Sequence, residues 1–430
     1  MAPFLICPCW ANILCSTRCC ASNERVVVLW GVICLRLNVK KSFIAKCLFI
    51  RRGWLAQQIK SVIFTLKSYV YTRVLLKFKP QANVLTSKAN QMPIAVICDT
   101  MTWKNFHQEF ATVSLTPRTW KDAFSADPRK KIRFLFCEAT WKGLATSCWR
   151  GQVYKDRRVL YENRQELLKI LKRCNAEGIP TVFWAKEDPL YFQGETYDFA
   201  DTALKFDYVL TTAAECVPKY QALGHKNVHV WPFGFSPKIY YPPKPPHKNR
   251  ELVAVFAGSW FEEHPLRCRD LADIFDMLLD AKIPLCIYDR NRTNGISTKP
   301  FPEKYQPYLN DAVLYEKLGD IYRGVEFVIN VSTVCTSDTM FSRRVYEAMA
   351  CGCIVISNES LGIRQQFGNN LWYIGEDFDF ERLECIRQNN IETVFSSHTF
   401  GQRMEQLFTL IEATQTDDET LLAIPSKSKN

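Results

Sequence analysis

The sequence of 430 residues lacks any apolar run long enough to cross a membrane. Its longest such run, Val26 to Leu35, ends at Arg36 after ten residues, whereas a spanning helix needs about 20. Cys-x-x-Cys pairs are also missing, and Cys351-Gly-Cys353 has no further cysteine or histidine beside it. We therefore predict no metal site. With 47% hydrophobic and 13% aromatic residues, the chain is globular rather than disordered or repetitive.

Acidic residues are almost absent from the first fifth of the chain. Residues 1–92 hold 14 Lys and Arg but a single acid, Glu24, whereas the remainder holds 41 basic and 43 acidic residues. The net charge of +11 therefore sits in an appendage, and a basic groove across the whole protein is not expected. Nucleic acid is accordingly not our predicted partner. Eleven of the 18 cysteines lie in the later part, mostly within apolar segments, which favours a reduced, cytoplasmic protein.

The basic, cysteine-rich extension, residues 1–91, contains one regular pattern. Leu55, Ile59, Val62 and Leu66 recur at helical spacing among lysines and arginines, which predicts a basic amphipathic helix over 54–78. Such a helix binds anionic lipid, so one hypothesis is peripheral contact of residues 41–79 with the inner face of the membrane. Two alternatives stay open: the helix packs on the body, or the segment precedes the true start at Met92.

Residues 92–241 read as a first α/β domain in which apolar strands alternate with helices. Parallel strands joined by helical crossovers are the expected result. The predicted strands are Ile94–Cys98, Ile132–Cys137, Pro180–Trp184, Asp207–Thr211 and Val228–Pro232. One helix is predicted over Leu160–Glu177, because Gly178 and Pro180 end it.

A proline-rich hinge, residues 242–248, precedes a second α/β domain at 249–413 and a disordered tail at 414–430. The hinge belongs to Tyr241-Pro-Pro-Lys-Pro-Pro246, a stiff extended connector. In the second domain we predict strands Leu252–Ala257, Pro284–Tyr288, Val325–Val331, Cys353–Ser357 and Leu371–Ile374, and helices Pro265–Lys282, Tyr315–Arg323, Phe341–Ala350 and about Thr399–Ala413. Two doubly wound domains, each with strand carboxyl ends facing a shared cleft, are predicted.

A polar loop and helix after Asn330 carry the clearest candidate site. Arg343 lies where the helix 341–350 starts, and Glu347 follows one turn later. An arginine and a helix start bind phosphate, and a carboxylate one turn away accepts hydrogen bonds from ribose. The alternative is an ordinary surface Arg–Glu pair. The predicted donor-binding residues are Gly258, Ser259, Asp289, Arg290, Thr339, Met340, Ser342, Arg343, Arg344 and Glu347.

Carboxylates that follow the strands of the first domain are the candidate catalytic residues. Glu187, Asp188 and Asp99 each follow a predicted strand and suit a general base that takes a proton from an acceptor hydroxyl; a structural cap is the alternative for each. Lys186, Trp149 and Arg150 are the predicted acceptor-side residues, with core packing as the alternative for the tryptophan. We predict no cofactor.

From Ile94 to about Ile374 the sequence resembles the CgeB/YkvP-like spore-maturation glycosyltransferases of the GT-B superfamily. The matching blocks are Trp141-Lys-Gly, Cys148-Trp-Arg150, Ile179-Pro-Thr-Val-Phe-Trp-Ala-Lys-Glu-Asp-Pro189, Phe206-Asp-Tyr-Val, Cys216-Val-Pro-Lys-Tyr220, Phe256-Ala-Gly-Ser, Ile287-Tyr-Asp-Arg, and Thr339-Met-Phe-Ser-Arg-Arg through Cys351-Gly. Two positions depart from the pattern: Ala185 replaces the family's asparagine, and Thr339 stands where retaining GT-B enzymes have a first glutamate.

The resemblance implies a GT-B fold and transfer of a sugar from a nucleotide-diphospho-sugar donor to a hydroxyl of a glycan, lipid-linked or protein acceptor, without metal, in surface polysaccharide or glycan assembly. Thr339 puts a retaining mechanism in doubt. Three alternatives remain: a non-catalytic nucleotide- or glycan-binding protein, a nucleic-acid-base glycosyltransferase that uses the basic arm, and a nucleotide-sugar epimerase.

Overall fold

The computed structural model describes residues 54–71, 85–86, 92–124, 131–144, 147–245 and 250–422. The chain divides into two units, residues 1–66 and 67–430, and both α/β domains belong to the second unit. In the first unit, the described residues belong to helix α4 (Trp54–Tyr69). The amphipathic helix predicted over 54–78 therefore forms over 54–69, and residues 72–78 lie outside the described part.

The last residues of α4 contact the first domain. Ser68 Oγ lies 3.0 Å from Tyr161 Oη, and the Tyr69 ring packs edge-on against the Tyr161 ring at 5.9 Å. The predicted contact of residues 41–79 with a membrane stays a prediction. Across the described residues, no helix combines the length and apolar character needed to traverse a bilayer.

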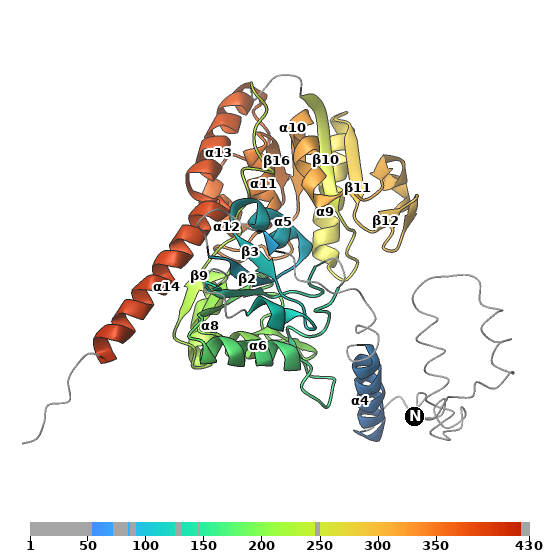
Figure 1. Cartoon of the computed structure of the whole chain (residues 1–430). Helices are drawn as coiled ribbons and strands as arrows, with labels where there is room; N and C mark the ends of the chain where they lie inside the picture. Colours follow the sequence, from blue (N-terminus) through green and yellow to red (C-terminus); the bar gives the residue numbers. More distant parts are fainter. Residues whose placement is uncertain are drawn as a thin grey trace, which may run out of the picture. The chain divides into compact units, whose positions relative to one another are not determined.

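The first domain is built on a seven-stranded sheet (Figure 1). Its strands, in spatial order, are β1 (Leu85–Thr86), β3 (Thr112–Ser114), β2 (Ile94–Ile97), β4 (Leu135–Glu138), β6 (Thr181–Ala185), β8 (Tyr208–Thr211) and β9 (Val228–Val230). All neighbours pair in parallel except β1, which runs antiparallel to β3. The sheet therefore begins before Met92, within the segment predicted to be an appendage.

Helices and short segments complete the first domain. They are α5 (Thr100–Glu109), α6 (Gln165–Ala176), α7 (Phe199–Ala203), α8 (Val217–Ala222), the 3-10 turns Trp120–Ala123 and Ala214–Cys216, and a small ladder of β5 (Lys155–Asp156) with β7 (Tyr197–Asp198). Helix α6 starts five residues later than predicted. The side chain of Asn163 explains the delay, because its amide donates to the Gly151 and Tyr154 carbonyls and its oxygen accepts from the Asp156 N–H, which holds the backbone in a turn.

The second domain is built on a six-stranded, all-parallel sheet. Its strands, in spatial order, are β14 (Leu309–Asn310), β11 (Leu285–Asp289), β10 (Glu251–Gly258), β15 (Val325–Asn330), β16 (Ile354–Ser357) and β17 (Trp372–Tyr373). Around it lie α9 (Pro265–Asp280), α10 (Leu318–Gly324), α11 (Arg344–Ala350), α12 (Leu361–Phe367) and α13 (Leu383–Ser397), with the hairpin β12 (Arg292–Thr293)–β13 (Ile296–Ser297).

Each sheet has one point where the strand order reverses. It lies between β2 and β4 in the first domain and between β10 and β15 in the second. Connections leave in opposite directions at such a point and open a crevice outside the strand carboxyl ends, where open α/β sheets bind ligands. Two Rossmann-like domains of this kind make the GT-B fold, so the predicted fold class is confirmed.

The chain crosses between the two domains twice, and the two crossings are hydrogen-bonded to each other. The Phe235 N–H donates to the His398 carbonyl at 3.3 Å, and the Phe400 N–H donates to the Phe235 carbonyl at 2.9 Å. Ile239 and Tyr240 already pack in the second domain's core. The first crossing therefore precedes the predicted hinge at 242–248, of which residues 246–248 lie outside the described part.

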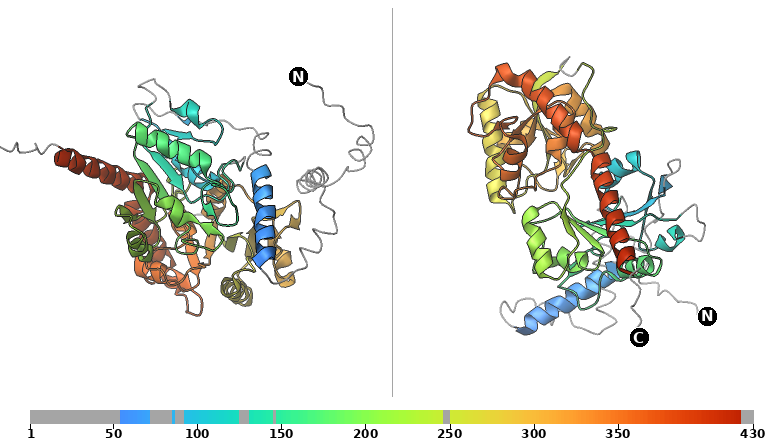
Figure 2. Two further views of the ribbon diagram at one scale, coloured as in Figure 1. Left: turned by 90° about the horizontal axis from the view of Figure 1, so that it is seen from below. Right: turned by 90° about the vertical axis from the view of Figure 1, so that its left-hand side faces the viewer.

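After the second crossing, the chain returns to the first domain as α14 (Phe400–Leu422). Phe400, Met404, Leu407 and Ile411 pack in one cluster with the first domain's buried aromatic residues, and Figure 2 shows α14 beside that domain. The first domain is thus discontinuous in sequence, and residues 400–413 belong to it rather than to the second domain. The helix also extends nine residues into the predicted disordered tail, whose residues 423–430 are not described.

Candidate functional site

A cavity of about 650 Å³ lies between the two domains. On the second-domain side it is lined where β10 and β15 end, by Gly258 and by residues 331–334. On the first-domain side, Lys186 and Glu187 follow directly after β6. Both sides therefore place strand carboxyl ends at the cavity, as the two reversals of strand order require.

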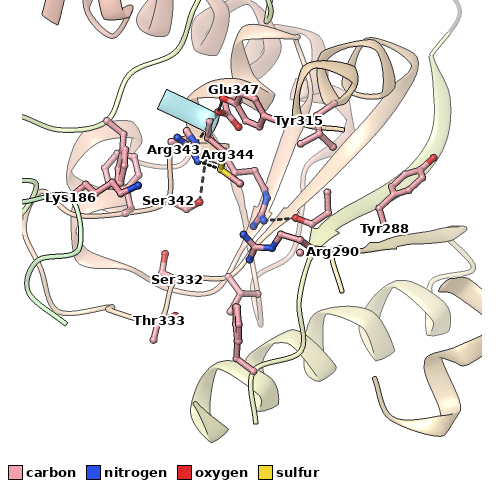
Figure 3. A pocket seen from close by; sticks show the side chains of 18 of the residues that line it. Lys186, Tyr288, Arg290, Tyr315, Ser332, Thr333, Ser342, Arg343, Arg344 and Glu347 are labelled. Carbon is pink, nitrogen blue, oxygen red and sulfur yellow. Dashed lines mark hydrogen bonds and ion pairs between the residues drawn. The ribbon is translucent and has the colours of Figure 1, made fainter. Parts of the chain in front are cut away.

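Four arginines of the second domain line this cavity: Arg267, Arg290, Arg343 and Arg344. Arg267 comes from the first turn of α9, Arg290 directly follows β11, and the last two stand where α11 begins. Figure 3 shows Arg290 and Arg344 turned toward one another.

Neutral oxygens hold three of these guanidinium groups in place. Arg267 donates to the Ser259 carbonyl at 3.1 Å, Arg290 to Ser259 Oγ at 3.3 Å, and Arg344 to the Ala257 carbonyl at 2.6 Å. Within the described residues, no carboxylate lies within ion-pair distance of any of the three. Their positive charges are therefore fixed in position but not neutralised.

The pKa values report the same excess of positive charge. Burial, followed by the charges of Arg344 and Arg290, lowers the pKa of Arg267 to about 10. Burial, followed by Arg344 and Arg343, also lowers the pKa of Arg290, while Asp289 and then Glu187 act in the opposite direction. Like charges held together in a partly buried space favour an anionic ligand, because its negative charge removes their repulsion.

Glu347 is the carboxylate that forms an ion pair with Arg343, the fourth of these arginines. It is 3% exposed, pairs with Arg343 Nε at 3.2 Å and accepts a hydrogen bond from the Tyr315 hydroxyl. Burial raises its pKa, although Arg343 and Tyr315 oppose the rise. Arg343 and Glu347 therefore form the i, i+4 pair expected from the sequence, but buried at the cavity rather than exposed.

A second charged group lies on the first-domain side, where β2, β4 and β6 end. Lys186 Nζ lies 3.0 Å from Asp99 Oδ2 and 2.8 Å from Glu138 Oε1. Burial raises the pKa of Glu138. Burial also acts to raise the pKa of Asp99, but Lys186, Thr140 and the Gly143 N–H outweigh it and lower that pKa. In contrast to the arginines, this cation is closely paired.

Glu187 and Asp188 are adjacent in sequence but occupy different surroundings. Glu187 lines the cavity and has a hydrogen bond with Trp141, and burial raises its pKa. Asp188 is buried away from the cavity, where its carboxylate accepts from Thr211 at 2.7 Å and from Tyr220 at 3.1 Å. Burial raises the pKa of Asp188 to about 7.

Several predicted site residues lie elsewhere. Trp149 is 1% exposed in the first domain's core, and its indole N–H donates to the Leu115 carbonyl, which fits the core-packing alternative rather than contact with an acceptor. Arg150 is exposed, 6.0 Å from the Tyr71 ring. Asp289 instead accepts hydrogen bonds from Ser297 and the Asn291 N–H, which fixes the turn after β11.

Two more predicted donor residues have structural contacts. Thr339 bridges the domains, because its hydroxyl donates to the Thr212 carbonyl at 2.8 Å and accepts from the Ala214 N–H at 2.9 Å. Ser259 is buried beneath the arginines it holds. By contrast Met340, Ser342 and Gly258 do line the cavity, and a Cβ on Gly258 would lie 2.6 Å from the Phe256 ring.

Sequence patterns do not indicate Arg267, Tyr315 or Phe261 as cavity residues. Arg267 lies in an amphipathic helix two residues before Arg269, which is exposed. Their spacing in the sequence does not indicate which of the two lines the cavity. Tyr315 begins a 3-10 turn (Tyr315–Lys317), and its hydroxyl also accepts from Asn105 of α5 at 2.8 Å. That contact joins segments 210 residues apart in sequence, a separation no local pattern reveals.

No group of three or more His, Cys, Asp or Glu side chains in the described residues is placed to hold a metal ion. His225 and His229 are spaced His-x-x-x-His, but among the described residues they belong to no such group of three. The eleven cysteines from Cys98 onward are all free thiols.

Residues 289–409 match the family model described as glycosyl transferase-like. The matched residues cover the later part of the second domain and the first turns of α14. No curated protein matches the chain in sequence.

The solved structures that are similar to this chain at low identity include the following three. A chain of the GtfA/B complex is 14% identical over 59% of this chain, with a TM-score of 0.37, and this chain spans 61% of its length. The sucrose-phosphate synthase of Thermosynechococcus elongatus is 14% identical over 75% of this chain and 100% of its own, with a TM-score of 0.44. HepE of Anabaena, solved with UDP and glucose, is 13% identical over 75% of this chain and 91% of its own, with a TM-score of 0.46.

Proposed function

We propose that the protein is a glycosyltransferase that takes a sugar from a nucleotide-diphospho-sugar donor bound in the second domain. The observation that supports this most directly is the set of three fixed, unneutralised arginines, Arg267, Arg290 and Arg344, at the cavity. A diphosphate supplies the negative charge that these groups lack, and guanidinium groups bind phosphate through paired hydrogen bonds.

The same arginines would serve the chemical step. When the sugar leaves the donor, negative charge develops on the diphosphate, and cations already held in position stabilise it without reorganisation. Glu347 lies at the edge of this group, where its carboxylate would accept a hydrogen bond from a hydroxyl of the ribose or of the sugar. Met340, Ser342 and Gly258 would contact the rest of the donor.

Glu187 is our candidate for the base that deprotonates the acceptor. It is the carboxylate of the first domain that lines the cavity directly beside Lys186, and a raised pKa suits proton transfer near neutral pH. Asp99 is a weaker candidate because its oxygens are occupied and its pKa is lowered. Asp188 lies outside the cavity.

The finer assignments are part of the same proposal. The resemblance to CgeB/YkvP-like proteins supports surface polysaccharide or glycan assembly, and the cysteine usage supports a cytoplasmic setting. HepE was solved with UDP and glucose, so UDP compounds are the first donors to test.

The decisive experiment compares Arg267→Ala with Arg269→Ala. Both arginines lie in the first turns of α9, but Arg269 is 67% exposed and does not line the cavity. Thermal stability is measured against UDP, GDP, dTDP and CMP compounds, each with its sugar. A ligand at 100 times its dissociation constant adds about 2.7 kcal/mol. We expect one nucleotide to stabilise the parent protein and Arg269→Ala, but to stabilise Arg267→Ala much less. Equal shifts in both variants would refute the diphosphate site.

One observation favours a second candidate, a nucleotide-binding protein without turnover. Thr339 occupies the position of the first glutamate of retaining enzymes, and its hydroxyl is used between the domains. The neighbouring Asp338 is directed to Gln365 on the surface. Tight nucleotide binding without release of free sugar or product, over hours with each donor of the panel, would favour this candidate.

A further inference from the structure

The paired lysine on the first-domain side has a chemistry that the donor site does not explain. Lys186 is directed into the cavity from the end of β6 (Figure 3). A lysine ammonium has three N–H donors. Two are used by Asp99 and Glu138, so one donor remains for a ligand.

The two carboxylates beside Lys186 each already accept three hydrogen bonds within the protein. Oδ1 of Asp99 accepts from Thr140 and from the Gly143 N–H at 3.1 Å, and Oδ2 accepts from Lys186. Oε1 of Glu138 accepts from the Asp99 N–H and Lys186, and Oε2 accepts from Thr102. These carboxylates therefore hold the ammonium in one position rather than bind a ligand themselves.

The residue next to Lys186 supplies the complementary group. Glu187 also lines the cavity, and its carboxylate accepts hydrogen bonds. Lys186 and Glu187 thus present one hydrogen-bond donor and one acceptor side by side on a single loop. A hydroxyl group needs both, since its oxygen accepts and its hydrogen donates.

We propose that Lys186 and Glu187 together bind hydroxyl groups of an uncharged sugar, which is the acceptor end. This inference rests on the proposed function and specifies the substrate class of its second site. Lys186 donates to an acceptor oxygen, and Glu187 accepts the hydrogen of the same hydroxyl or of the one beside it.

The charges around the loop explain why the acceptor end is uncharged. A carboxylate or phosphate there would lie near Asp99, Glu138 and Glu187. Two cations of the second domain act on these carboxylates, but Arg343 is paired with Glu347 and Arg290 is assigned to the donor diphosphate. With the donor bound, Lys186 is therefore the positive charge left to oppose the three carboxylates. An ammonium group would instead meet the Lys186 ammonium directly. A neutral hydroxyl avoids both repulsions and uses both partners.

The test uses the full chain, saturated with whichever nucleoside diphosphate of the panel stabilises it most. Binding of three probe sets is then titrated: neutral methyl glycosides of glucose, galactose and mannose, their 6-carboxylates, and their 2-amino analogues. We expect at least one neutral glycoside to bind, with the carboxylate and amino forms at least tenfold weaker. Lys186→Met should weaken the neutral glycoside at least tenfold while nucleotide affinity changes less than twofold.

Lys169→Met is the matched control, because Lys169 is a half-exposed lysine of the same domain paired with Glu166. It should leave both affinities unchanged. If Lys186→Met does not fold, Lys186→Met with Glu138→Gln removes one positive and one negative charge together and should show the same tenfold loss.

The outcomes separate this inference from the proposed function. A parent protein that binds no nucleotide contradicts the proposed function. If the parent protein binds nucleotide normally, three results would each contradict the acceptor assignment alone. These are no binding of any neutral glycoside, a carboxylate form that binds as tightly as the neutral form, and a Lys186→Met variant that binds the glycoside like the parent protein.

Discussion

The two domains hold their charged side chains at the cavity in opposite ways. In the first domain, Lys186 is paired with two carboxylates at 3.0 and 2.8 Å. In the second, Arg267, Arg290 and Arg344 are fixed by neutral oxygens, and among the described residues no carboxylate pairs with them. A charge that is paired within the protein is compensated before any ligand binds. A charge without a partner lowers the stability of the ligand-free protein until a ligand of opposite charge binds. The first domain therefore presents a preformed polar surface, and the second domain presents an anion site.

The largest effect on the free energy of unfolding is expected when the ion pairs of Lys186 in the first domain are removed. Lys186→Met leaves the buried Glu138 and the partly exposed Asp99 without their cation. Removing one partner of a buried pair typically costs about 3–5 kcal/mol of the free energy of unfolding. Urea unfolding of the apo protein measures the loss. The control Lys169→Met should change that free energy by no more than about 0.5 kcal/mol, and an equally small loss for Lys186→Met would show that the cluster is not needed for stability.

In the second domain, removing a charge is expected to weaken nucleotide binding without lowering the stability of the apo protein. Arg290→Gln removes a charge that its neighbours repel, so the free energy of unfolding of the apo protein should stay the same or rise. Nucleotide affinity should fall by about 1.5–3 kcal/mol, the range for a hydrogen bond to a charged group, or roughly 10- to 150-fold. Calorimetric titration measures the affinity. If Arg290→Gln strongly lowered the free energy of unfolding but kept full nucleotide affinity, the proposed difference between the two domains would be wrong.

A third prediction concerns the buried carboxyl group of Asp188, whose hydrogen-bond donors are Thr211 and Tyr220. The pKa of Asp188 is about 7 in the folded protein and near 3.9 when unfolded. The folded state therefore binds more protons between these values, so the free energy of unfolding decreases as pH rises from about 4 to 7, by at most about 1.4 kcal/mol per pH unit. Asp188→Asn keeps an oxygen for Thr211 and Tyr220 and should flatten this dependence. Urea unfolding at pH 5 and 7.5 measures both slopes, and equal slopes would exclude Asp188 as the titrating group.

The smallest effect is expected for a charge pair that joins the two domains at the surface. Lys104 Nζ lies 2.9 Å from Glu316 Oε1, with about a third of each side chain exposed. Such pairs contribute about 0.2–1 kcal/mol and are screened by salt. Lys104→Met should therefore lower the melting temperature slightly at low salt, not at 1 M NaCl, and leave nucleotide affinity unchanged. A loss that persists in 1 M NaCl would point to packing rather than charge.

Sequence patterns predict one class of site residue well. Lys186, Glu187 and Asp99 are identifiable because each follows a buried apolar strand, and the strand order of the sheet then brings their side chains together. The fold class is predictable for the same reason, since strands alternating with helices leave few arrangements. The strands β2, β6, β8, β10, β11, β15 and β16 all lie within two residues of their predicted bounds.

Other features depend on contacts between distant parts of the chain. Trp149 and Arg150 are adjacent in sequence, yet one is in the core and the other on the surface. Thr339 has the spacing of a donor residue, but its hydroxyl contacts Thr212 and Ala214 of the other domain. Strand β3 is absent from the predicted strands because its three residues lie in a segment without alternation, and it exists through pairing with β2.

The return of α14 to the first domain has a practical consequence for dividing the protein. A fragment that ends in the proline-rich segment would leave the aromatic faces of Phe106, Trp184 and Trp231 uncovered, because Phe400 packs on all three. Such a fragment is expected to aggregate. The second domain alone would in turn carry an unmatched apolar helix at its end. Expression of a single lobe therefore calls for a gene in which the codons for α14 are joined directly to those for the first domain, so that each lobe becomes one uninterrupted polypeptide.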